Sequence, residues 1–205
     1  MMREGIPEAL ALRDTDVSPQ DVNSPAARIS VAQLLAAYRN ALTFSRDPAF
    51  AIRLGQSTQV TTLGMYGYAL LSTPNQRGLI DLVLKYHRLM LATADLSFRE
   101  ESDTRVGIWT IEPVVIATAE PRLHRFIVEV YLGTVTKLSV DILGRPEIKK
   151  DIRVTYARPK DMPEYEGLFQ CPVHFEQENN ELRVNTSWID EPSIRYNEIT
   201  FQSMQ

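Results

Sequence analysis

The chain has 205 residues, a length that suits one domain with a sizeable hydrophobic core. Its composition, 44% hydrophobic and 23% charged, is typical of a folded globular protein and excludes an intrinsically disordered one. The formal net charge of -4 lacks the basic footprint of nucleic-acid-binding proteins, so we do not expect this chain alone to bind DNA.

The N-terminal residues contain no apolar run long enough for a signal peptide, and no later segment is apolar enough to span a membrane. Cys171 is the single cysteine, which excludes an internal disulfide and a four-cysteine zinc site. These features predict a cytoplasmic protein that does not bind a membrane.

Residues 1–28 contain three prolines among polar residues, a composition that predicts a flexible leader. The first long helix is expected over residues 31–45, because Ser30 and Gln33 have the spacing of a capping box and apolar residues then recur at helical intervals. An aspartate followed by Pro48 is typical of the start of a short second helix, which Gly55 can close.

An apolar segment at residues 64–71 precedes Ser72-Thr73-Pro74, a start signal for a longer amphipathic helix that ends near residue 94. The hydrophobic period then changes to two, which predicts a hairpin with strands near residues 96–98 and 105–111. A third strand is expected at residues 114–119.

The second half of the chain begins with a predicted helix over residues 121–143. A half-buried strand at residues 152–156 follows, then a short helix within residues 163–169 and a hairpin that pairs residues 173–175 with 182–184. Mixed runs of helices and strands favour an α+β fold, in which helices pack on a largely antiparallel β-sheet.

A search for catalytic chemistry finds one local pair of interest, Cys171 and His174. In an extended segment, residues three apart point to opposite faces, so we interpret Cys171 as a buried structural residue. Nucleophile-elbow, Walker and dinucleotide-binding motifs are missing, and the histidines do not form metal-ligand pairs. The sequence therefore predicts no catalytic residues, no metal and no cofactor.

Aromatic residues give the strongest indication of a binding site. Tyrosine and tryptophan combine a flat apolar surface with a polar group, as small-molecule pockets require. We expect a ligand between the helices and the sheet, near Tyr66, Tyr68, Tyr86 and Trp109. Packing in the hydrophobic core is the alternative explanation for each of them.

The helix at residues 121–143 is apolar on more than one side, which suggests a second packing partner. In one interpretation this helix meets its own copy across a two-fold axis, with Tyr131 and Val135 in a homodimer interface. In the other, the helix is buried on most sides within the monomer.

Five segments, taken in order, resemble one family: the N-terminal arabinose-binding and dimerisation domains of AraC-type bacterial transcription regulators. The resemblance covers about residues 30–195. The segments that carry it are residues 47–55, 64–74, 86–89, 169–175 and 188–192.

The resemblance implies a domain that binds a small-molecule effector and forms a homodimer, with DNA contacted through a helix-turn-helix domain absent from this chain. On this basis we expect an effector-binding and dimerisation domain at residues 29–195 and the start of a linker at 196–205. The alternatives are a small cytosolic enzyme with an unrecognised active site and a purely structural dimer without a pocket. Turnover of a bound metabolite would distinguish the enzyme from the binding module.

Overall fold

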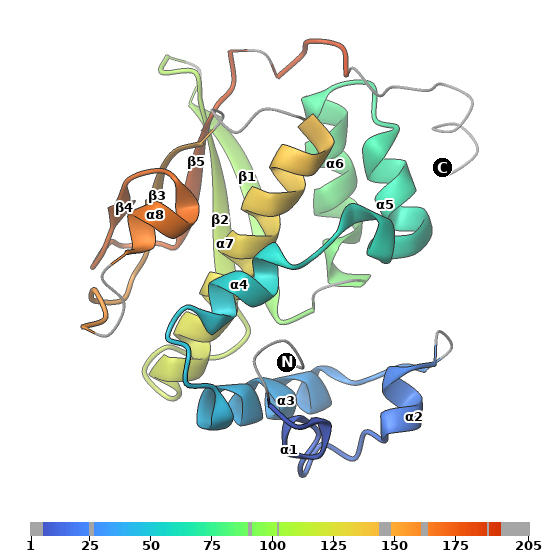
Figure 1. Cartoon of the computed structure of the whole chain (residues 1–205). Coiled ribbons are helices and arrows are strands. Elements are labelled where there is room, and N and C mark those ends of the chain that lie inside the picture. The colour runs from blue at the N-terminus through green and yellow to red at the C-terminus, as the bar shows by residue number, and fades with distance from the viewer. Residues whose placement is uncertain are drawn as a thin grey trace.

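The structure is a computed structural model that describes residues 6–24, 27–89, 92–101, 103–143, 149–160, 164–187 and 189–193. It has the predicted α+β fold, with helices packed on a largely antiparallel sheet (Figure 1). The helices are α1 (Glu8–Ala11), α2 (Pro19–Val22), α3 (Val31–Phe44), α4 (Phe50–Gln56), α5 (Gly64–Leu71), α6 (Gln76–Tyr86), α7 (Pro121–Leu143) and α8 (Tyr165–Phe169), with short 3-10 helices η2 (Val60–Leu63) and η3 (His87–Leu89).

The strands are β1 (Ala94–Glu101), β2 (Val106–Pro113), β3 (Lys149–Arg153), β4 (Val173–His174) and β5 (Glu181–Asn185). Their order across the sheet is β1-β2-β5-β3-β4, and the pairs are antiparallel except β3 with β4. The predicted hairpin of β1 and β2 is confirmed. The predicted pairing of residues 173–175 with 182–184 is wrong, because β5 lies between β2 and β3 while β4 pairs with the far side of β3.

Helix α7 forms the centre of the fold and lies across one face of the sheet (Figure 1). Side chains on several of its sides are buried, among them Ile127, Val128 and Leu132, none of which is exposed. Helix α4 crosses α7 at close range, because two glycines, Gly55 and Gly133, meet at the crossing. Gly55 therefore lies inside α4, which continues to Gln56, and does not close that helix as the sequence suggests.

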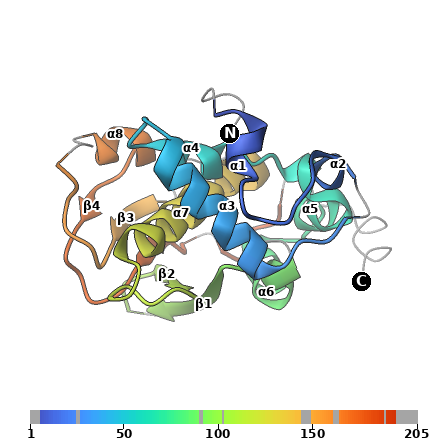
Figure 2. The same ribbon diagram turned by 90° about the horizontal axis from the view of Figure 1, so that it is seen from below.

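Helix α3 begins where its capping box predicts. The Ser30 hydroxyl accepts from the Gln33 amide, and the Gln33 side chain accepts from the Ser30 amide. Seen from below in Figure 2, α3 runs over the N-terminal part of α7. The rings of Tyr38 and Phe126 pack there with their centroids 5.0 Å apart, so α3 extends the core on the side of α7 away from the sheet.

The segment expected to be a flexible leader contains two one-turn helices in the part of it that the structure describes. Helix α1 lies against α3 below the rest of the fold (Figure 1). Ile6 and Ala11 are buried, and the Asn40 amide donates to the carbonyl oxygens of Ala11 and Arg13 at 3.1 and 2.6 Å. The expected linker at residues 196–205 lies outside the described residues, as does Trp188.

Two predicted elements differ in extent from the structure. Helix α6 starts at Gln76, because Asn75 is its N-cap and accepts from the Gly78 amide at 2.9 Å. The helix ends at Tyr86 and not near residue 94, where β1 begins. The third strand predicted at residues 114–119 is wrong: β2 ends at Pro113, and Ile116, which is 70% exposed, begins a turn that leads into α7.

Candidate functional site

A cavity of about 410 Å³ lies between the sheet, α7 and the cap formed by η2, α5 and α6. A volume of this size is typical of small-molecule sites, which range over roughly 300–1,000 Å³. The lining residues come from seven elements and from the segment after α4, and are Ser57, Thr58, Thr62, Leu63, Tyr66, Leu70, Leu79, Val83, His87, Leu96, Trp109, Tyr131, Thr134, Val135, Leu138, Ser139 and Ile142.

The cavity lies between two separate hydrophobic clusters. The main cluster joins the sheet to α4 and α7, and Trp109 in β2 belongs to it. The smaller cluster is centred on Val60, Leu70, Leu79 and Ile142, where the cap meets the C-terminal turns of α7. A ligand in this cavity would contact residues of both clusters.

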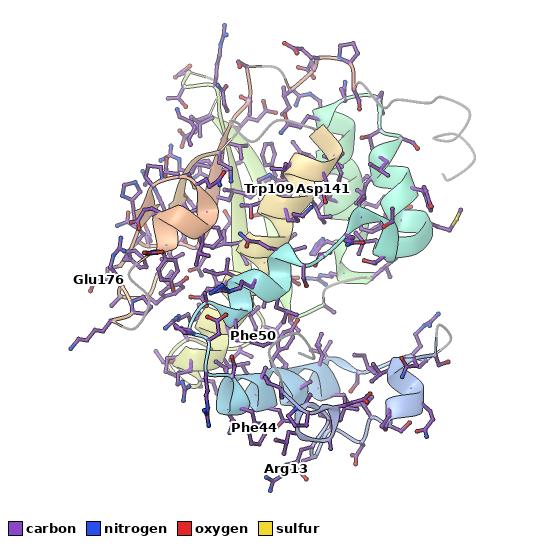
Figure 3. All side chains as sticks on the ribbon, viewed as in Figure 1. Arg13, Phe44, Phe50, Trp109, Asp141 and Glu176 are labelled. Atoms are coloured by element: carbon purple, nitrogen blue, oxygen red, sulfur yellow. The ribbon has the colours of Figure 1, made fainter. Side chains whose placement is uncertain are left out.

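The structure brings together two of the four aromatic residues that the sequence suggests. Tyr66 and Trp109 line the cavity, Tyr66 from α5 and Trp109 from the face of the sheet that α7 covers (Figure 3). Tyr68 is 49% exposed and Tyr86 is half-buried, and neither is among the lining residues. Burial raises the pKa of the Tyr66 phenol to about 12, so this group is a neutral hydrogen-bonding hydroxyl at neutral pH.

The two residues predicted for a dimer interface also lie at this cavity. Tyr131 is 1% exposed, and its hydroxyl accepts from the Ala94 amide at 3.0 Å and donates to the Ala94 carbonyl oxygen at 3.3 Å. Val135 is half-buried and lines the cavity as well. Within the single chain, Tyr131 is therefore buried, as in the alternative interpretation, and its part in a homodimer interface stays a prediction.

Sequence reasoning missed most of the cavity wall. Helix α7 provides Thr134, Leu138 and Ser139 in addition to Tyr131 and Val135, and η3 provides His87. The surplus apolar surface of residues 121–143 was the available signal. It indicated a second packing partner, and in the structure part of this surface, at Tyr131 and Val135, faces the cavity, while Phe126 packs against Tyr38 of α3.

The lining carries almost no charge. It contains no Asp, Glu, Lys or Arg, and its single histidine is His87. Several of its hydroxyl groups donate to backbone carbonyl oxygens: Ser57, Thr62 and Ser139 at 2.7 Å and Thr134 at 3.4 Å. The cavity therefore suits an uncharged ligand with a large apolar surface.

A second cavity, of about 280 Å³, lies at the corner where α3 and α4 meet the start of α7. Phe50, labelled in Figure 3, is in its wall, together with Arg46, Arg122, Arg125 and the buried carboxylate of Glu129. Its polar wall is already occupied by internal contacts, since Arg125 Nε donates to Glu129 at 2.7 Å. This cavity is smaller and more polar than the first.

The structure supports no nucleophile at Cys171. The thiol is buried, its pKa is raised to about 11 by burial, and His174 on β4 is exposed. Among the described residues, no group of three or more histidine, cysteine or acidic side chains is arranged to hold a metal ion. None of the described helices combines the length and the apolar character that crossing a membrane requires.

The chain can be compared with known protein families. The family model for the N-terminal arabinose-binding domain of AraC transcription regulators matches residues 5–193. The chain belongs to this family. The match includes residues 5–28, which the sequence analysis set apart as a leader.

Known regulators resemble this family member over part of their length. The chain is 27% identical over 188 residues to an ornithine utilization regulator of Pseudomonas aeruginosa, which covers 91% of this chain and 53% of that protein. It is 28% identical over 100 residues to an uncharacterised helix-turn-helix-type transcriptional regulator of Mycobacterium tuberculosis, covering 48% of this chain and 29% of that protein. The chain thus spans about half the length of the first regulator.

A solved structure shares the fold. The transcriptional regulator CdpR from Pseudomonas aeruginosa superposes with a TM-score of 0.68 at 20% sequence identity, over 82% of this chain and 53% of that one. At this identity the likeness concerns the fold alone. The family and the relatives are transcription regulators, which points away from an enzyme.

Proposed function

We propose that this domain is the sensing part of an AraC-type transcription regulator and binds an uncharged, largely apolar small molecule in the cavity between the sheet, α7 and the cap. The observation that carries the proposal is the lining itself. It combines apolar side chains of two hydrophobic clusters with hydroxyl groups and a histidine, and it lacks acidic, lysine and arginine side chains.

The chemistry of the lining also limits which effectors suit this domain. The name of the Pseudomonas relative connects that protein with ornithine utilization. An amino acid with several charges would lose its hydration in this cavity without an opposite charge to pair with, at a cost of several kcal/mol. We therefore do not extend ornithine to this chain.

We propose that the domain acts on transcription through a separate helix-turn-helix domain and as a homodimer. The family and the greater length of its relatives support the first part. The acidic net charge of -4 is consistent with a domain that does not itself bind DNA. A small cytosolic enzyme, the alternative, finds no support in the lining, which lacks a nucleophile paired with a base.

A thermal-shift screen of the 205-residue chain tests the proposal. We expect uncharged apolar compounds to stabilise the domain, and amino acids and organic acids to have no effect. A ligand at about 100 times its Kd adds about 2.7 kcal/mol to the free energy of unfolding. Disappearance of the bound compound over time would indicate turnover and support the enzyme alternative.

Substitution of Val135, which lines the cavity, locates the binding site. Val135→Phe adds bulk to the wall and should abolish the stabilisation while the domain stays folded, because the cavity has room for the ring. Val114→Phe is the matched control, since Val114 is 50% exposed and is not among the lining residues. Equal ligand responses in both variants would contradict binding in this cavity.

A further inference from the structure

One polar atom near the cavity has no hydrogen-bond partner. His87, at the start of η3, has an Nε2 atom that is buried and has no hydrogen-bond partner among the described residues. The same residue lines the cavity, but Nε2 itself has almost no accessible surface, so a ligand would reach this atom only after a shift of the ring or of the side chains that cover it. A buried polar atom without a partner costs about 1–3 kcal/mol, so a partner supplied by a ligand would be favourable.

The other ring nitrogen determines what kind of partner Nε2 needs. Nδ1 of His87 lies 3.3 Å from the carbonyl oxygen of Leu84. A carbonyl oxygen only accepts hydrogen bonds, so this contact is a hydrogen bond when Nδ1 carries the proton. In the neutral imidazole, Nε2 is then the unprotonated nitrogen and accepts a hydrogen bond.

Four hydroxyl groups of the lining also act as acceptors toward the cavity. Ser57, Thr62, Thr134 and Ser139 each direct the hydroxyl proton to a backbone carbonyl oxygen, which leaves their oxygen atoms as acceptors. The wall therefore offers more acceptors than donors. A ligand that brings its own donor can pair with it.

We propose that the effector is an uncharged molecule with an apolar body and a hydroxyl or N–H donor, and that His87 Nε2 accepts the hydrogen bond from this donor. The inference rests on the proposed function and adds to it the chemical class of the ligand. A carboxylate would find only neutral donors, such as the hydroxyl groups of Tyr66 and Thr58, and no lysine or arginine to balance its charge, and an ammonium group would have no carboxylate to pair with.

Three probes of one shape test this class: p-cyclohexylphenol, p-cyclohexyltoluene and p-cyclohexylbenzoate. They carry a donor, a methyl group and a negative charge at the same position. We expect the 205-residue chain to bind the phenol about tenfold more tightly than the toluene, and the benzoate least. Calorimetric Kd values provide the measurement.

Substitution of His87 identifies the acceptor. In His87→Leu the advantage of the phenol over the toluene should fall to about one, with toluene binding retained. Tyr86→Phe, next to His87 but outside the lining, is the control and should keep the tenfold ratio. Retained toluene binding also shows that the variant still forms the cavity.

A readout on the unmodified protein makes the test independent of folding of the variant. In long-range nitrogen–proton NMR spectra, the unprotonated Nε2 signal of His87 should shift on addition of the phenol and not of the toluene. Equal affinities for phenol and toluene, or tightest binding of the benzoate, would overturn the inference and leave the cavity as a binding site. Failure of all three probes to bind would count against the proposed function itself.

Discussion

At the scale of single residues, Glu129 is a buried carboxylate that lies outside the cavity beneath the cap. It is 2% exposed on α7, and its Oε1 accepts from Arg125 Nε at 2.7 Å and from the Tyr165 hydroxyl. Burial raises the pKa of Glu129, while Arg125 and Tyr165 act in the opposite direction. The carboxyl group thus connects α7 to α8 through Tyr165, whose side chain is fully buried.

Removal of this acceptor should destabilise the domain. Glu129→Ala leaves Tyr165 and Arg125 without their partner, so we expect a loss of about 3–5 kcal/mol in the free energy of unfolding. Glu129→Gln keeps an amide oxygen for the Tyr165 hydroxyl and should cost less. Urea unfolding followed by circular dichroism measures both, and equal losses in the two variants would contradict a hydrogen-bonding role for Glu129.

Residue chemistry could be predicted from the sequence, but side-chain direction could not. Tyr66 and Tyr68 are of the same type and two positions apart, yet Tyr66 lines the cavity and Tyr68 is 49% exposed. Residues two apart on a helix are rotated by about 200° around its axis, so their side chains point to nearly opposite sides. The apolar composition of residues 64–71 does not by itself indicate a helix, so the opposite orientations of these two tyrosines on α5 could not be predicted.

At the scale of elements, the crossing of α4 and α7 depends on two glycines. A Cβ atom on Gly133 would lie 2.4 Å from the Ile52 carbonyl oxygen, and one on Gly55 would lie 2.2 Å from the Val130 carbonyl oxygen. Both neighbours are backbone atoms, which cannot move without shifting a helix. The close approach also allows Thr134, beside the cavity, to donate to the Gly55 carbonyl oxygen at 3.4 Å.

Gly133→Ala should therefore lower the stability although alanine is the better helix former. We expect a loss of about 1–3 kcal/mol, since overpacking outweighs the roughly 0.5–1 kcal/mol of helix propensity. Gly167→Ala in α8 is the matched control: its Cβ would have its nearest neighbour at 4.0 Å, so it should be neutral or stabilising. Thermal unfolding of both variants provides the measurement, and a stabilised Gly133→Ala would show that the helices can separate at no cost.

Elements with a local signal were predictable, and those that depend on distant contacts were not. The capping box of Ser30 and Gln33 and the change of period at β1 and β2 correctly predicted α3 and the hairpin. The position of β5 between β2 and β3 depends on contacts distant in sequence, which periodicity does not encode. Residues 114–119 resemble a strand in composition, but Val114 and Ile116 are exposed in the structure.

At the scale of the whole molecule, the two hydrophobic clusters suggest how ligand binding in the cavity changes the stability of neighbouring segments. The cap of η2, α5 and α6 packs around the smaller cluster and meets the main cluster around the cavity. Segments with fewer buried contacts open more readily. An empty cavity beneath the cap should therefore make η2 and α5 less stable than the crossing of α4 and α7.

Hydrogen exchange measured by mass spectrometry can test this coupling. Without ligand, we expect faster exchange in residues 60–71 than in α4 and the first half of α7. A saturating apolar ligand such as p-cyclohexylphenol should slow exchange in η2, α5, α6 and the C-terminal half of α7, because it bridges the two clusters. Residues 103–105 of the β1–β2 turn, which are not among the lining residues, should not change.

The pattern of protection also distinguishes the two cavities. A ligand in the smaller cavity would protect the end of α3, the start of α4 and the first turns of α7, where Arg46, Phe50 and Arg122 lie. Protection confined to those segments would contradict binding beneath the cap. In Val135→Phe, the same ligand should leave exchange of the cap unchanged, because the added ring occupies the space between the two clusters that the ligand would otherwise fill.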